Sequence, residues 1–146
     1  MCFDKLAEEF IDTEMVLCHI PENQQLIKAI HGEMFVLGYL SEHGKRAYPK
    51  ELSKALDVST ARIARMLNHM EEKGLIVRQV DGQDMRQKIV ILTEKGDSLS
   101  VIQHKEAVGA ARRILERLGF EDACEFLRIQ RKMIDSIAWE VTQMQQ

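Results

Sequence analysis

The stretch from residue 50 to residue 96 constrains the fold of this chain more than any other part. It holds two short segments with helical apolar spacing, followed by two runs rich in β-branched residues. In the first segment, Leu52, Ala55 and Leu56 fall on one side, and Pro49 suits the first helical position because no N–H partner is needed there. This order predicts two helices joined by a tight turn, and then a β-hairpin.

The second predicted helix has clear start and stop signals. Ser59 is a good N-cap, and Gly74 is a natural stop because glycine adopts positive φ at no cost. The apolar face comprises Ile63, Met66, Leu67 and Met70. The opposite face comprises Thr60, Ala61, Arg62, Ala64, Arg65 and Asn68. Arg62 and Arg65 lie one turn apart, and arginine binds guanine through two hydrogen bonds or clamps a phosphate.

A β-hairpin is predicted after this helix. Its strands are residues 76–80 and 88–92, and Asp81-Gly82 supplies a turn signal between them. Arg86 near the tip suits the DNA minor groove, whose negative potential attracts arginine. Asp84 is expected to hold the Arg86 side chain by a salt bridge, or to be an ordinary turn acid. Exposed arginines alone are typical of a solvated surface. A helix-turn-helix and the β-hairpin that follows it, called the wing, together favour a DNA-binding module.

These residues resemble the MarR family of bacterial winged-helix transcription regulators. The matching segments are Leu52-Ser53, Val58-Ser59, Arg62-Ile63-Ala64-Arg65, Glu71-Glu72-Lys73-Gly74-Leu75-Ile76, the pair Asp84-x-Arg86, and Leu92-Thr93-Glu94-Lys95-Gly96. The match is strong over about residues 33–96, and the wing pair followed by Leu-Thr-x-x-Gly is fairly specific. One departure is Arg62, where many relatives have a threonine or another small polar residue.

The resemblance implies a mainly α fold with a small β-hairpin wing. Residues 1–146 would form a single domain, with a winged helix-turn-helix module at 33–96 and helical dimerisation regions at 1–32 and 97–146. It further implies a homodimer that binds a pseudo-palindromic operator on double-stranded DNA, usually as a repressor that a small ligand releases. The expected DNA contacts are Ser59, Thr60, Ala61, Arg62, Arg65, Asn68, Asp84 and Arg86.

The effector implied by the resemblance is a small apolar or phenolic molecule, bound between the dimerisation helices and the winged module. Candidate lining residues are Met15, His19, His31, Met34, Tyr39 and Trp139. Methionine is adaptable and suits promiscuous pockets, although each of these residues is equally typical of an ordinary core. No cofactor is expected.

The flanks carry apolar stripes of helical period. The N-terminal stripe comprises Phe3, Leu6, Ala7, Phe10, Ile11, Met15 and Cys18, and Pro21 interrupts it. After Thr93, a good N-cap, a long helix is expected to reach Gly119, and another follows. A winged module of about 60 residues cannot cover two long terminal helices, so these predict a C2 homodimer. The alternative is an extended monomeric helical core.

Charge is distributed unevenly along the chain. The net charge is −5 over residues 1–33, +3 over residues 34–96 and −1 over residues 97–146. The positive charge therefore falls on the proposed DNA module, where release of counterions would supply affinity. No apolar run approaches the length of a membrane span, and the N-terminus does not resemble a secretory signal, so a cytoplasmic protein is expected.

Two alternatives on the same scaffold stay open. The three cysteines show no C-x-x-C pair, but Cys18 lies on a predicted N-terminal helix, where some relatives sense peroxides. Certain relatives bind zinc, although Cys18, His19, His31, Glu33 and His104 show no ligand spacing, and no metal site is expected.

His69, on the second predicted helix, is expected to meet phosphate or solvent. A winged-helix module used only for protein–protein contact is a third class. No glycine-rich phosphate loop, paired-histidine metal motif or catalytic triad is present in the sequence, so no enzyme is predicted.

Overall fold

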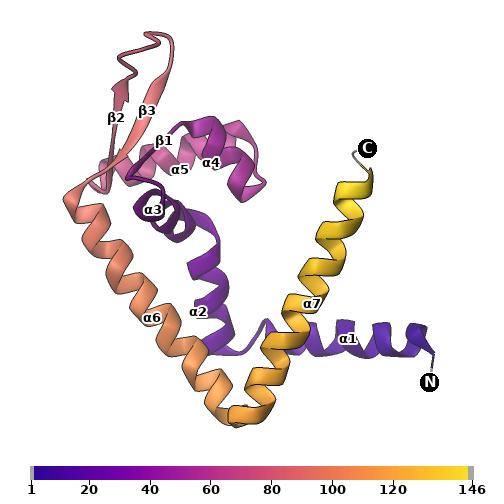
Figure 1. The fold of residues 1–146 in the computed structure, drawn as a ribbon. Helices are drawn as coiled ribbons and strands as arrows, with labels where there is room; N and C mark the ends of the chain where they lie inside the picture. The colour runs from indigo at the N-terminus through magenta and orange to yellow at the C-terminus, as the bar shows by residue number, and fades with distance from the viewer. Residues whose placement is uncertain (1, 145–146) are drawn as a thin grey trace. The chain divides into compact units, whose positions relative to one another are not determined.

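A computed structural model describes the backbone of residues 2–144 and the side chains of residues 2–138 (Figure 1). The chain divides into two compact units, residues 1–110 and 111–146. The helices are α1 (Phe3–Leu17), α2 (Pro21–Ile30), α3 (Gly32–Glu42), α4 (Pro49–Leu56), α5 (Thr60–Glu72), α6 (Glu94–Leu118) and α7 (Phe120–Met144). The strands are β1 (Arg46–Ala47), β2 (Ile76–Val80) and β3 (Lys88–Leu92). The predicted fold class, mainly α with a small β wing, is confirmed.

The three strands form one antiparallel sheet in the order β1-β3-β2. β2 and β3 pair along their whole length, from Ile76 opposite Leu92 to Val80 opposite Lys88. The two strands match the predicted hairpin, whereas β1 was not predicted. β1 adds only two residues to the edge of β3, which is too short a segment to show a strand pattern in sequence.

The core of the first unit lies where α3, α4 and α5 pack with the sheet. The apolar stripes of the two predicted helices supply Leu52, Ile63, Leu67 and Met70, each at most 1% exposed. The other buried members are Val36, Leu37, Leu40, Ala47, Leu75, Ile76, Val90 and Leu92. Burying one such side chain stabilises the fold by roughly 1.5–3 kcal/mol, so this cluster fixes the orientation of α5 beneath the sheet.

The ends of α4 and α5 follow from their local sequence. Pro49 occupies the first turn of α4, and Asp57 ends that helix in the left-handed region at φ 53°. The backbone N–H of Arg62 donates to the Ser59 hydroxyl over 3.2 Å, so Ser59 caps α5 as predicted. Gly74 follows α5 with φ 73°, a conformation that costs glycine little.

The junction between the wing and α6 is the single residue Thr93. Its hydroxyl accepts the backbone N–H of Gly96 over 3.0 Å, which caps α6, and donates to the Gly74 carbonyl over 2.7 Å. Lys95 Nζ donates to the carbonyl of Lys73 over 2.8 Å. The start of α6 is therefore fastened to the end of α5.

Gly96 is required at this junction by space rather than by backbone conformation. A Cβ atom built on Gly96 would lie 2.1 Å from the carbonyl oxygen of Leu75, far inside a van der Waals contact. The absence of a side chain lets the first turn of α6 approach the chain that leads into β2. This explains why the segment Leu92-Thr93-Glu94-Lys95-Gly96 ends in glycine.

Helix α1 buries none of its own residues. Its apolar side chains are open to solvent, from Phe3 at 88% and Phe10 at 58% to Met15 at 62% exposure. In the second unit, α7 also exposes large apolar side chains, among them Phe126 and Ile134. Within the described residues, no helix combines the length and the apolarity that crossing a bilayer demands.

Candidate nucleic-acid interface

The outward face of α5 is polar and open. Thr60, Ala61, Arg62, Arg65 and Asn68 are all exposed, opposite the buried stripe of the same helix. The small Ala61 leaves the backbone of the first turn accessible to a groove. Because the core holds the inner face, this outer face presents itself without rearrangement. The structure thus places all five predicted α5 contacts on one surface.

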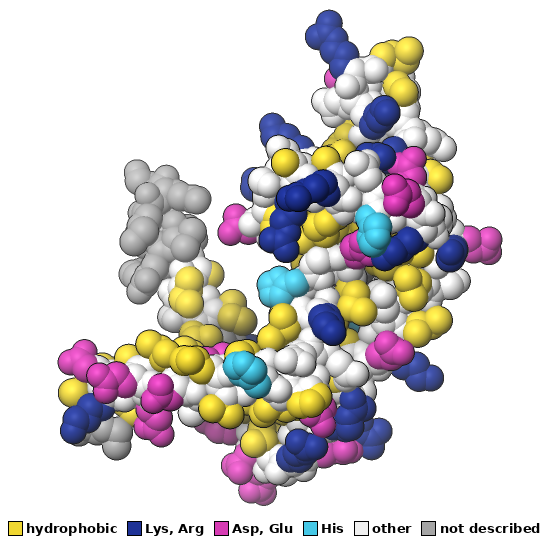
Figure 2. Space-filling view, turned by 180° about the vertical axis from the view of Figure 1, so that it is seen from behind, with side chains coloured by type: hydrophobic (Ala, Val, Ile, Leu, Met, Phe, Trp, Pro, Cys, Tyr) yellow, Lys and Arg dark blue, Asp and Glu magenta, His cyan; other side chains and the backbone are white. Residues whose placement is uncertain are grey.

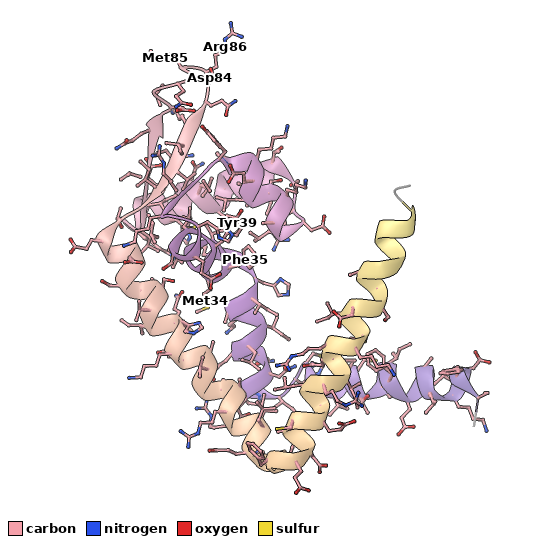
Figure 3. All side chains as sticks on the ribbon, viewed as in Figure 1. Met34, Phe35, Tyr39, Asp84, Met85 and Arg86 are labelled. Atoms are coloured by element: carbon pink, nitrogen blue, oxygen red, sulfur yellow. The ribbon has the colours of Figure 1, made fainter. Side chains whose placement is uncertain are left out.

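The tip of the wing is a hydrogen-bonded β-turn over residues 84–87. The backbone N–H of Gln87 donates to the Asp84 carbonyl over 3.1 Å, and Asp84 Oδ1 accepts the N–H of Arg86 over 3.0 Å. Met85 and Arg86 are therefore the two corner residues of the turn. Figure 3 shows Asp84, Met85 and Arg86 together at the far end of the wing.

The predicted salt bridge between Asp84 and Arg86 is not what this turn contains. The Asp84 carboxylate receives the backbone amide of Arg86, and in the described part of the chain it forms no ion pair with the guanidinium. The physical reason is local: an aspartate at the first position of a turn bonds most readily to the backbone two residues on. The Arg86 side chain is left to extend from the tip.

The loop end of the wing is anchored to Tyr48, the residue directly before α4. Asp81 is only 8% exposed, its backbone N–H donates to Gln87 over 2.8 Å, and its carboxylate accepts the N–H of Gln83 over 3.1 Å. The Tyr48 hydroxyl donates to the same carboxylate. This bond raises the pKa of Tyr48 and lowers the pKa of Asp81, which the Gln83 amide lowers further.

A second anchor joins α5 to α3. His69 Nδ1 donates to Glu33 Oε1 over 2.6 Å, and Lys73 Nζ donates to Glu33 Oε2 over 2.9 Å. Burial opposes ionisation of Glu33, but the bonds from His69 and Lys73 outweigh it and lower the pKa of Glu33. His69 remains exposed to solvent, as expected, but the sequence did not show that its Nδ1 also pairs with a carboxylate of α3.

The cations of the module divide into anchored and unpaired groups. Arg78 Nε lies 2.5 Å from Glu71 Oε2, which ties β2 to α5. In contrast, Arg62, Arg65 and Arg86 take part in no ion pair among residues 2–138. Figure 2 shows Lys and Arg side chains spread over the winged module up to the tip of the wing. Unpaired arginines on a firm scaffold are suited to bind phosphates and base edges.

The candidate effector residues with described side chains are spread over α1, α3 and the two breaks on either side of α2. Met15, on α1, and His19, directly after that helix, are exposed; His31, at the break between α2 and α3, is exposed as well. Met34 and Tyr39 are half-buried on α3, and Figure 3 shows both. The Tyr39 ring stacks on Phe35 of the same helix and on His43, the residue directly after it. The side chain of Trp139 lies outside the described residues.

The cysteine and metal hypotheses depend on the segment after α1. The Cys18 thiol is exposed and donates to the Met15 carbonyl over 3.0 Å, and His19 Nδ1 donates to the same carbonyl over 2.7 Å. In the part of the chain that the structure describes, no three His, Cys, Asp or Glu side chains gather as metal ligands. Glu33, a conceivable ligand, is engaged with His69 and Lys73 instead.

Sequence reasoning missed the roles of Tyr48, Asp81, Glu33 and Met85. Asp81 was predicted only as part of a turn signal, and an aspartate that comes directly before a glycine gives no sign of a tyrosine 33 residues earlier in the chain. Met85 is the one large apolar residue in the polar loop 81–87, but a single exposed apolar residue is common on surfaces, so nothing in the sequence indicates its role. These residues add two anchors and one exposed apolar group to the predicted interface.

The comparisons with known proteins agree with this geometry. Residues 31–87 match the model of the MarR family. MepR of Staphylococcus aureus, described as a transcription regulator of the multidrug efflux pump MepA, is similar in structure: the TM-score is 0.67, the identity is 23%, and the match covers 94% of this chain and 99% of MepR.

Two further solved structures share the fold. Wild-type MarR from E. coli matches with a TM-score of 0.65 and 19% identity over 91% of this chain and 96% of MarR. The organohalide-sensing regulator RdhR, in its 2,4-dichlorophenol-bound form, matches with a TM-score of 0.68 and 14% identity over 93% of this chain and 82% of RdhR.

Proposed function

We propose that this chain, whose residues 31–87 match the MarR family, is a transcription regulator of that family. It binds double-stranded DNA as a homodimer and represses transcription until a small ligand releases it. The observation that carries the proposal is the pairing of an open α5 face bearing Arg62 and Arg65 with a preformed wing tip bearing Arg86. Such a pair suits a complex in which α5 lies in the major groove and the wing lies in the minor groove.

The roles of the proposed contacts follow from their positions. Arg62, in the first turn of α5, binds a base edge in the major groove, and Arg65, one turn on, binds a base edge or a flanking phosphate. Thr60, Ala61 and Asn68 form the rest of the face, while Ser59 orients the helix by capping it. Arg86 enters the minor groove, and Asp84 shapes the turn that carries it.

The homodimer is supported by the apolar surface that the flanking helices leave open. Exposed side chains of α1, α6 and α7 include Phe10, Ile102 and Phe126. A second copy of the chain, related by two-fold symmetry, would cover such faces and would also place two α5 helices for two half-sites. A pseudo-palindromic operator follows from that symmetry. Acting on bacterial DNA, the protein would work in the cytoplasm.

The effector class is proposed by analogy. RdhR is described in complex with 2,4-dichlorophenol, and a small apolar or phenolic ligand for this chain would contact Met15, His19, His31, Met34, Tyr39 or Trp139. The half-buried Met34 and Tyr39 offer a thioether and an aromatic ring on α3 for such a molecule. Release of DNA by phenols added to a preformed complex tests this part of the proposal.

The DNA-binding function is tested by selecting duplexes from the organism's genomic DNA and titrating the selected duplex at several salt concentrations. We expect binding with a steep salt dependence, and a selected sequence with two related half-sites. If the folded protein retains no duplex above random background at low salt, the winged module serves protein contact instead, and the proposal fails.

A redox-sensing regulator is the second candidate. The exposed Cys18 thiol beside His19 favours it, because accessibility is the first requirement for a sensing thiol. Loss of DNA binding after peroxide treatment, absent in Cys18→Ser, would establish this alternative. DNA binding that peroxide and thiol alkylation leave unchanged would exclude it.

A further inference from the structure

Met85 is the most exposed large apolar side chain of the winged module, at 83%. It lies at the wing tip beside Arg86, and Figure 3 shows both at the end of the wing. A single exposed apolar residue is common on protein surfaces and alone carries no meaning. Its position at the corner of a hydrogen-bonded turn, next to the unpaired Arg86, is what requires an explanation.

Hydrogen bonds hold the backbone of the wing tip in place. There are four: Gln87 N–H to the Asp84 carbonyl, Arg86 N–H to the Asp84 carboxylate, Asp81 N–H to the Gln87 carbonyl, and Gln83 N–H to the Asp81 carboxylate. The Tyr48 hydroxyl fixes Asp81 in turn. The backbone that carries Met85 therefore does not need to be ordered on binding, and preorganisation of this kind increases affinity.

The width of the minor groove limits where Met85 can lie. Consecutive Cα atoms are about 3.8 Å apart, and the minor groove of B-DNA is about 6 Å wide. A turn that brings Arg86 into the groove therefore brings Met85 against its walls and floor. The Asp84 carboxylate is bonded to the turn's own amide, so it does not block this approach.

We propose that Met85 is a minor-groove wedge that packs at a base step beside the site of Arg86 and partly unstacks it. Methionine is among the residues that insert in this way, and its unbranched thioether fits a narrow slot. The contribution is uncharged and depends on shape, so it favours flexible pyrimidine–purine steps such as TA over stiff ones. This inference rests on the DNA-binding function proposed above.

The experiment uses the full-length protein, a duplex selected by the wild type, and three variants, Met85→Ala, Met85→Leu and Arg86→Ala. Affinity is measured by gel shift at several salt concentrations, and unstacking by the fluorescence of 2-aminopurine at each step under the wing. We expect Met85→Ala to lower affinity about tenfold with an unchanged salt slope and to abolish the fluorescence increase. Met85→Leu, which keeps the bulk, should restore both.

The possible failures are distinguishable. Wild-type affinity and wild-type 2-aminopurine fluorescence for Met85→Ala, while Arg86→Ala weakens binding, would overturn the wedge and leave the DNA-binding function standing. A change in the salt slope for Met85→Ala would also overturn it, because the lost contact would then be ionic. If the wild type selects no duplex at all, the proposed function itself is wrong.

Discussion

Glu33, at the start of α3, lies 2.6 Å from Nδ1 of His69, which is on α5, 36 residues further along the chain. Lys73 completes the contact from the next turn of α5. The helix that presents Arg62 and Arg65 is thus fastened at its far end to α3, directly after the break at His31. A carboxylate outside the exposed α5 face therefore adds to the apolar core in holding that face in place.

Glu33→Gln removes the charge of this anchor and keeps its shape. Because the pKa of Glu33 is lowered in the folded state, its stabilisation is present above about pH 4.5 and is lost as the pH falls through the folded value. Partly exposed pairs contribute little, so we expect a loss of about 0.5–1 kcal/mol at pH 7 in urea unfolding. The loss should shrink as the pH falls below about 4.5, because the folded-state carboxylate then becomes protonated.

The matched control for this anchor is Glu42→Gln, an exposed carboxylate at the other end of α3. It should change the free energy of unfolding by less than about 0.5 kcal/mol. Equal losses for both variants, or a Glu33→Gln loss that does not depend on pH, would show that the anchor does not contribute through its charge.

Arg86→Ala tests the minor-groove contact of the wing. The side chain makes no ion pair with described residues, so its removal should leave the fold intact and lower operator affinity by roughly 1–3 kcal/mol. Gel-shift titration at fixed salt, with a circular dichroism spectrum for each sample, measures both properties. Gln83→Ala, in the same loop, is the control and should bind like the wild type; unchanged affinity for Arg86→Ala contradicts the contact.

Arg62 and Arg65 should differ in what they contribute. Arg62→Ala is expected to flatten the preference at one base pair in each half-site, at a cost of about 1–3 kcal/mol on the operator. If Arg65 binds phosphate, Arg65→Ala will instead weaken operator and random DNA alike and reduce the salt slope by about one. Equal loss on operator and random DNA for Arg62→Ala would make it a positioning residue.

The exposed stripe of α1 predicts a tight homodimer with an interface larger than about 2,000 Å². Sedimentation should show a dimer at micromolar concentration, and Phe10→Glu, which places a charge on the stripe, should shift it toward monomer. Glu9→Gln, on the same helix, serves as control and should leave the dimer unchanged. A folded wild-type monomer at this concentration would refute the prediction.

Gly96→Ala should destabilise the fold, because its methyl group would meet the Leu75 carbonyl. Overpacking of this kind costs typically about 1–3 kcal/mol. Gly38, inside α3, has no atom within 4 Å of an added Cβ, so Gly38→Ala should stabilise the protein by about 0.5–1 kcal/mol. Thermal unfolding of the two variants compares them directly, and equal effects would exclude the steric explanation.

Local sequence predicted the parts of this fold that local physics decides. Ser59, Pro49 and Gly74 specify helix ends by capping and by backbone preference, and the structure confirms each of them. The strands 76–80 and 88–92 were predicted from their β-branched residues and were found with the same bounds. Such signals need only a few neighbouring residues to act.

The anchors could not be predicted because their partners are distant in sequence. Tyr48 meets Asp81, and Glu33 meets His69, only after the core has packed α3, α4 and α5 together. Of the two expectations for Asp84, the salt bridge to the Arg86 side chain was wrong, and the ordinary turn acid is what the structure has. The sequence shows that Asp84 and Arg86 are neighbours. It does not show whether the Asp84 carboxylate accepts the backbone amide of Arg86 or pairs with its guanidinium.

Only Thr93 separates β3 from α6, so a rotation of the wing about the first turn of α6 is transmitted in full to the wing tip. A strand of five residues spans about 17 Å, so a rotation of about 10° at that turn moves the tip by about 3 Å, half the width of the minor groove. With no slack between β3 and α6 to absorb the motion, an angular change too small to disturb the core is enough to withdraw a side chain from the groove.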